Sequence, residues 1–75
     1  MSKVVNHEVT LILFETDNET GEPLVYDIIE TNRRYASHFC RRAYRNPVVT
    51  HIVAVAPNGR KNPERATAML REIQR

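Results

Sequence analysis

The sequence predicts a single small α+β domain in the order β-β-α-β-α: a three-stranded antiparallel sheet with an arginine-rich helix on one face and a short C-terminal helix. Three stretches rich in β-branched and aliphatic residues have the composition of strands, and two others place apolar residues at helical spacing. The chain has 75 residues, enough for one domain over 1–75, with an ordered core expected over about 7–74.

The first two strands are expected to form a hairpin. Residues 7–16, HEVTLILFET, are apolar on both faces around Ile12–Phe14, which indicates a central strand. Residues 17–23, DNETGEP, contain the Asp, Asn, Gly and Pro that favour a turn. The chain then returns as a second strand over 24–30, LVYDIIE.

An amphipathic helix is predicted over residues 33–45, RRYASHFCRRAYR. Thr31 or Asn32 is a suitable N-cap, and Asn46-Pro47 ends the helix because a residue before proline avoids helical geometry. At 100° per residue, the face toward the core is Ala36, Phe39, Cys40 and Ala43, and the outward face is Arg34, His38, Arg41, Arg42 and Arg45.

A third strand is predicted over 48–56, with Val49, Val53 and Val55 on one side and Ile52 on the other. A right-handed crossover through the helix places it beside the first strand, in the order 2-1-3. After a turn over 57–62, Asn62 is expected to cap a last helix over 62–74, whose core-facing residues are Ala66, Met69, Leu70 and Ile73.

Charge is divided unequally along the chain. Residues 1–30 carry one cation, Lys3, against seven anions, for a net charge of −6, and residues 31–75 carry ten cations against two anions, for +8. Such a division predicts two surfaces of opposite charge and a charged partner. The alternative is that the two halves face each other in the fold and neutralise one another.

The residues do not predict an enzyme or a cofactor. One cysteine cannot form an internal disulfide, and Cys40 is interpreted as a small buried hydrophobe. His38 and Cys40 lie about 200° apart around the helix, so they cannot share a metal ion. The loop 17–22 lacks the spacing of an EF-hand, and no phosphate-binding or nucleophile motif is present. Without an apolar run of membrane-spanning length or a signal peptide, a cytoplasmic location is expected.

Two functional hypotheses remain for the arginine-rich helix. It could bind DNA or RNA phosphates through Arg34, Arg41, Arg42 and Arg45, extended by Arg60 and Lys61. It could instead dock on a protein, with the same cations meeting an acidic surface and the hairpin acids Glu15, Asp17, Glu19 and Glu22 meeting a basic one. Tyr35 and Tyr44 flank its apolar face, and tyrosine and arginine are common at protein interfaces. The sequence favours docking because this uses both charged halves.

The β-β-α-β order of residues 7 to 56, together with the segregated charge, resembles small bacteriophage-encoded proteins that bind and inhibit host bacterial RNA polymerase. The resemblance implies a protein partner rather than a reaction. The chain would dock on polymerase subunits in the host bacterial cytoplasm and prevent the sigma-bearing enzyme from opening host promoters. The resemblance covers topology and charge, and no binding residue is carried over from that family.

Overall fold

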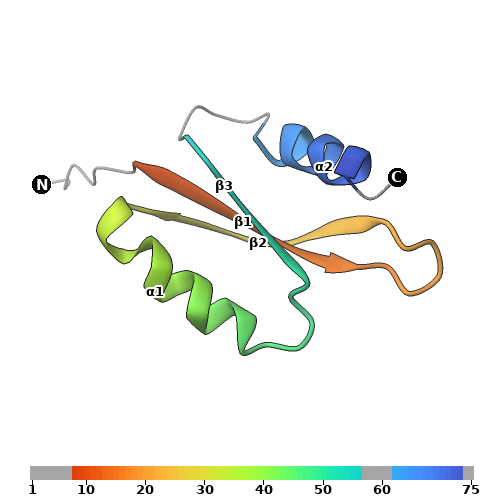
Figure 1. Cartoon of the computed structure of the whole chain (residues 1–75), viewed down its shortest axis with the longest axis horizontal. Helices are drawn as coiled ribbons and strands as arrows, with labels where there is room; N and C mark the ends of the chain where they lie inside the picture. Colours follow the sequence, from red (N-terminus) through yellow and green to blue (C-terminus); the bar gives the residue numbers. More distant parts are fainter. Residues whose placement is uncertain (1–7, 57–61, 74–75) are drawn as a thin grey trace, which may run out of the picture.

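The computed structural model describes residues 8–56 and 62–73, which form a three-stranded sheet with two helices (Figure 1). The elements are β1 (Val9–Thr16), β2 (Pro23–Thr31), α1 (Arg33–Tyr44), β3 (His51–Val55) and α2 (Asn62–Ile73). The strand order is β2-β1-β3, and both neighbouring pairs are antiparallel. The predicted α+β class, element order and strand order are therefore confirmed.

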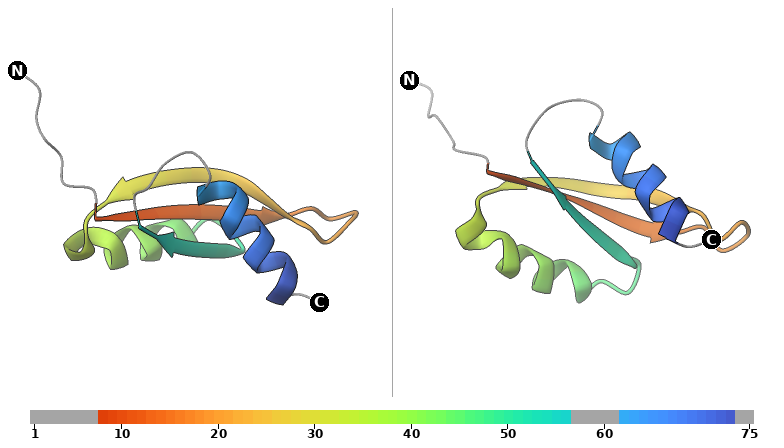
Figure 2. Two further views of the ribbon diagram at one scale, coloured as in Figure 1. Left: turned by 90° about the horizontal axis from the view of Figure 1, so that it is seen from above. Right: turned by 45° about the horizontal axis from the view of Figure 1, so that its top comes forward.

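β1 is the central strand, and both of its faces are buried. Side chains alternate along a strand, so Leu11 and Leu13 point to one face while Ile12 and Phe14 point to the other. The first face packs against α1 through Phe39, Cys40 and Ala43, and the second packs against α2 through Ala66 and Leu70. Figure 2 shows the two helices lying away from each other around the sheet. Neither α1 nor α2 has the length and apolar character of a membrane-crossing helix.

The pairing of β1 with β2 contains a β-bulge at Tyr26. Leu13 lies opposite Asp27, but the next residue, Phe14, lies opposite Val25, so Tyr26 is an extra residue in β2. A bulge of this kind bends its strand and redirects a side chain.

The hairpin turn is closed by its own backbone. Asp17 donates its N–H to the carbonyl of Glu22 at 2.8 Å and accepts from the N–H of Gly21 at 2.8 Å. Gly21 has a φ of 75°, a conformation that glycine adopts without the cost that a Cβ would impose.

The third strand begins later than the predicted 48–56, and Val49 lies on the opposite side from the one expected. The side-chain Oδ1 of Asn46 accepts from the N–H of Val48 at 3.0 Å, and the backbone carbonyl of Asn46 accepts from the N–H of Val49 at 3.0 Å. This turn interrupts the alternation on which the prediction rested. Val49 packs on the α1 side of the sheet, whereas Val53 packs on the α2 side.

The predicted core stripe of α2 is half wrong, because Met69 and Ile73 are 52% and 74% exposed. The helix is turned so that Thr67 is half-buried instead, which it tolerates because its hydroxyl donates to the carbonyl of Pro63 at 2.7 Å. The residues of α2 that are fully buried are Asn62, Ala66 and Leu70, spaced four apart.

Asn62 was expected to cap this helix and instead is its first residue. Its side-chain amide donates to the carbonyl of Ala56 at 2.8 Å, which ties the start of α2 to the end of β3. The predicted helix end at position 74 lies outside the described residues.

Candidate docking surface

The start of α1 is held by two side-chain acceptors. Asn32 is the N-cap, with extended backbone angles, and its Oδ1 accepts from the N–H of Tyr35 at 3.1 Å. The carboxylate of Glu8 accepts from the N–H of Arg33 at 3.2 Å. Both groups accept from N–H groups of the first helical turn, where the N–H of Tyr35 also reaches the backbone carbonyl of Asn32 at 3.2 Å. The negative charge of Glu8 suits the positive end of the helix. The orientation of α1 on the sheet is thus fixed where it leaves β2.

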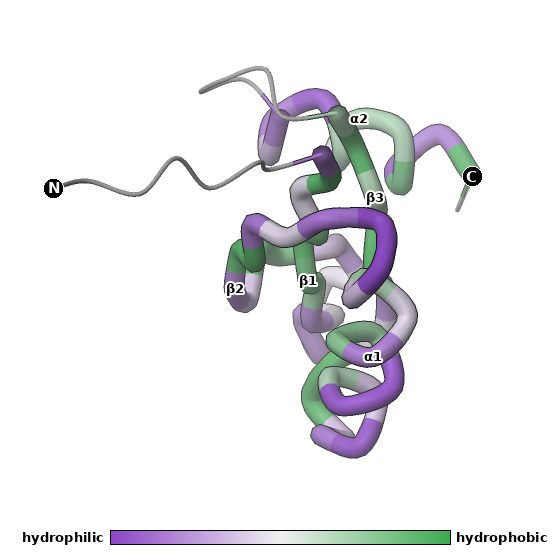
Figure 3. Tube along the Cα trace, turned by 90° about the vertical axis from the view of Figure 1, so that its left-hand side faces the viewer, coloured by the Kyte–Doolittle hydropathy of each residue, from purple (hydrophilic) through white to green (hydrophobic). Residues whose placement is uncertain are grey.

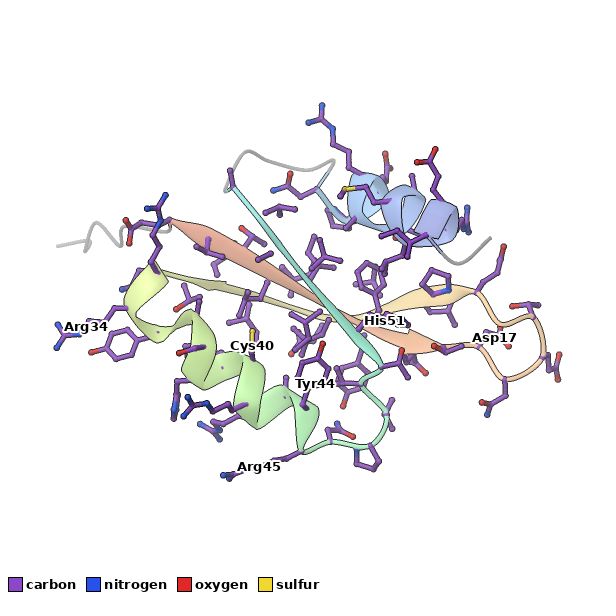
Figure 4. All side chains as sticks on the ribbon, in the orientation of Figure 1. Asp17, Arg34, Cys40, Tyr44, Arg45 and His51 are labelled. Carbon is purple, nitrogen blue, oxygen red and sulfur yellow. The ribbon has the colours of Figure 1, made fainter. Side chains whose placement is uncertain are left out.

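The outer face of α1 is cationic. In Figure 4, Arg34 and Arg45 extend away from the sheet near the two ends of the helix. Within residues 8–56 and 62–73, no carboxylate forms an ion pair with any arginine of α1, and each of these arginines is exposed. The exposed arginines are Arg33, Arg34, Arg41, Arg42 and Arg45.

Among the described residues, the charged side chains of the two halves form few ion pairs with each other. The ion pair between Arg71 and Glu22 joins them at 3.7 Å, and both side chains are 53% exposed. In Figure 4, Asp17 lies at the opposite end of the molecule from Arg34. The fold therefore does not bring the acidic hairpin onto the arginines of α1, as the alternative of internal neutralisation required.

Of the four hairpin acids, two are used within the domain. The carboxylate of Asp17 accepts from the N–H groups of Glu19 at 2.8 Å and Thr20 at 3.4 Å, which shapes the turn. Glu22 pairs with Arg71, as described. This leaves Glu15 and Glu19 as the hairpin acids available to a partner.

The structure gathers Arg34, Arg41, Arg42 and Arg45 on one helix and leaves the hairpin acids at the far end of the sheet. Arg60 and Lys61, predicted to extend the cationic patch, lie outside the described residues. Tyr35 and Tyr44 are 50% and 54% exposed, as expected for residues that flank the apolar face. Cys40 is partly rather than fully buried, and packs against the sheet.

A groove of about 320 Å³ lies between α1 and β2, on the side of the sheet that α1 covers. It arises because α1 packs mainly on β1. Asn46, just after the helix, donates its side-chain amide to the hydroxyl of Tyr26 at 2.9 Å and so spans the end of the groove. Arg42 also lines the groove, and the remaining lining residues are apolar: Leu13, Ile29, Phe39, Ala43 and Val49.

Sequence reasoning missed this groove and two of its polar lining residues, Tyr26 and Asn46. The available signals were a tyrosine within an otherwise aliphatic strand and an asparagine directly after a helix. In Figure 3, the colour along α1 changes back and forth between hydrophobic (green) and hydrophilic (purple) residues. The helix therefore lines the groove with Arg42 as well as with the apolar Phe39 and Ala43.

Elsewhere in the described residues, polar side chains fasten the sheet. Thr50 lies within hydrogen-bonding distance of Thr16 at 2.8 Å and of Nδ1 of His51 at 3.0 Å, and its backbone N–H donates to the carbonyl of Phe14 at 2.8 Å. The bonds to Thr16 and Phe14 join the start of β3 to the end of β1. No group of three or more His, Cys, Asp or Glu side chains in this part of the chain is arranged to hold a metal ion.

Comparisons of the chain with protein-family models, with curated proteins and with solved structures found no match.

Proposed function

We propose that the protein is a non-enzymatic regulator that docks on a large protein partner through α1. Bacterial RNA polymerase is the partner that the resemblance of topology and charge suggests, and inhibition of promoter opening is the corresponding activity. The observation that carries the docking proposal is a row of exposed arginines, without ion pairs in the described part of the chain, beside an apolar groove. Protein interfaces combine such an apolar centre with charges at the rim.

The alternative is a DNA- or RNA-binding protein that uses the same arginines. Exposed arginines without a carboxylate partner among the described residues favour it, and Asp17 of the acidic hairpin lies at the opposite end of the molecule from Arg34 (Figure 4). The groove favours a protein partner instead, because an apolar cleft beside Arg42 has no use in contacts to phosphates alone.

The test is direct binding of the purified, surface-immobilised chain to RNA polymerase, as core enzyme and with its sigma subunit, followed by a promoter-opening assay. We expect specific binding that falls about tenfold or more in the variant with Arg34→Gln, Arg41→Gln and Arg45→Gln, since charges across an interface set both association rate and affinity. The matched control is Arg65→Gln, an exposed cation on α2 away from this surface.

Circular dichroism of both variants should match the original chain, because all of the changed residues are exposed. Failure of polymerase to bind, combined with tight binding of a bare oligonucleotide, would replace the docking hypothesis with the nucleic-acid hypothesis.

A further inference from the structure

We infer that the groove between α1 and β2 binds an acidic segment of the partner protein, by taking up one large apolar side chain and pairing Arg42 with a carboxylate next to it. This inference rests on the proposed docking function and names the chemistry of the partner. It concerns the groove alone and does not depend on the partner being RNA polymerase.

The size and lining of the groove fit an apolar side chain. Its volume of about 320 Å³ is at the low end of small-molecule sites, which start at about 300 Å³. Its floor comes from Leu13 and Val49, which are 4% and 6% exposed and so already closely packed. Phe39 and Ile29 form partly buried walls. A residue such as phenylalanine or leucine would cover apolar surface that now faces water.

The charge around the groove selects an acidic neighbour for that side chain. Arg42 borders the groove, Arg41 precedes it on α1, and Arg45 is the C-cap of the same helix. None of the three has a carboxylate partner within the described residues. A guanidinium binds a carboxylate through two parallel hydrogen bonds, so an Asp or Glu beside the apolar residue would be held by Arg42.

Addition of a strand to the edge of β2 is a poorer use of this region. The bulge at Tyr26 breaks the regular spacing that a new strand would need, and the carboxylate of Asp27 accepts from the N–H of Ile28 at 2.8 Å. Bulges and charged residues protect edge strands from pairing in this way.

A second copy of the chain does not suit the groove either. A two-fold contact through this face would bring the arginines of two α1 helices together, which is repulsive. The acidic hairpin of another copy, residues 17–22, offers carboxylates but no apolar side chain to fill the groove.

The test uses the full-length, isotope-labelled protein and a short synthetic peptide of glycine and serine that carries one phenylalanine followed by two aspartates. Nuclear magnetic resonance titration should shift the amide signals of Phe39, Ala43 and Asn46 with saturable behaviour. Two control peptides replace the phenylalanine with serine or both aspartates with asparagine. We expect the first change to weaken binding at least about tenfold and the second about two- to fivefold.

Protein variants locate the contact. Arg42→Gln should weaken binding of the acidic peptide about two- to fivefold and should no longer distinguish it from the asparagine peptide. Arg34→Gln, near the other end of α1, is the matched control and should leave that distinction intact. Ala43→Met should fill the groove and lower the affinity of the phenylalanine peptide, and the peptide controls on the unaltered protein remain decisive if this variant does not fold.

The outcomes separate this inference from the proposed function. If the protein binds the peptide but not polymerase, the choice of partner is overturned and the groove assignment is kept. If it binds polymerase, and neither Arg42→Gln nor Ala43→Met changes that binding, the groove assignment is overturned and the docking proposal is kept. Peptide shifts confined to Val25 and Ile28 would indicate strand addition, and concentration-dependent shifts without peptide would indicate self-association. Either of these results, or no shift, would also overturn it.

Discussion

Phe14 and Phe39 lie on opposite sides of the sheet and serve different purposes. Phe14 is completely buried between β1 and α2, and Phe39 is partly exposed as a wall of the groove. We expect Phe14→Ala to lower the free energy of unfolding by about 3–5 kcal/mol, the usual cost of emptying a buried aromatic site. The total for a chain of this length is about 4–11 kcal/mol. Urea denaturation followed by circular dichroism measures the change.

Phe39→Ala is the matched comparison and should cost less, about 2–3 kcal/mol, because Phe39 is only partly buried. Equal costs for the two substitutions would mean that α1 lies closer to β2 in solution and that the groove is closed. The same denaturation series would therefore test an assumption on which the peptide experiment depends.

The start of α1 is the element whose position most affects the candidate site. Asn32→Ala removes the side-chain acceptor for the N–H of Tyr35 and should lower the free energy of unfolding by about 1 kcal/mol, within the roughly 0.5–2 kcal/mol seen for lost N-caps. Asn32→Asp keeps a side-chain acceptor, so its free energy of unfolding should stay within a few tenths of a kcal/mol of the original value. If Asn32→Asp lowers the free energy of unfolding as much as Asn32→Ala does, the capping bond does not contribute to stability.

Sequence patterns predicted the elements better than they predicted how the elements meet. The alternation in β1 and the 3.6-residue period in α1 follow from local geometry, so the central strand and the exposed arginines were predictable. Val49 was placed on the wrong side because a turn at Asn46 interrupts the strand pattern. Met69 and Ile73 were misplaced because periodicity gives a face of about the right width but not the rotation of the helix on its sheet.

The groove depends on relations between elements that no single segment encodes. It needs the bulge that displaces Tyr26, the position of α1 over β1, and the turn that carries Asn46 toward β2. Each of these is a tertiary feature. The cationic half of the site was therefore accessible to sequence analysis, whereas its apolar half was not.

At the scale of the whole molecule, charge is separated along an elongated shape. The described protein measures 46 × 26 × 19 Å, with the acidic hairpin and the start of α1 at opposite ends. At physiological salt the Debye length is about 8 Å, so charges at the two ends act on a partner almost independently. A small ligand at α1 would be insensitive to the hairpin, but a large protein could contact both ends.

This separation makes salt and charge sign a test between the two functional hypotheses. We compare a variant with Arg34, Arg41, Arg42 and Arg45 changed to Gln with a variant carrying Glu15→Gln and Glu19→Gln, and leave Asp17 in place because it shapes the turn. Binding of polymerase should weaken in both variants, because a large partner contacts both ends. Binding of duplex DNA by the original chain should stay at the non-specific level.

A nucleic-acid binder would behave differently in the same measurements. Four arginine–phosphate contacts would give a log–log salt slope of about −4, and this slope would disappear with the arginines. Neutralising Glu15 and Glu19 would leave this salt slope unchanged, because salt screens the charges of the hairpin from DNA bound at α1. Two results together would contradict docking at both ends: tight DNA binding with that steep slope, and polymerase binding that is the same with and without the hairpin acids. They would indicate that α1 binds a phosphate backbone.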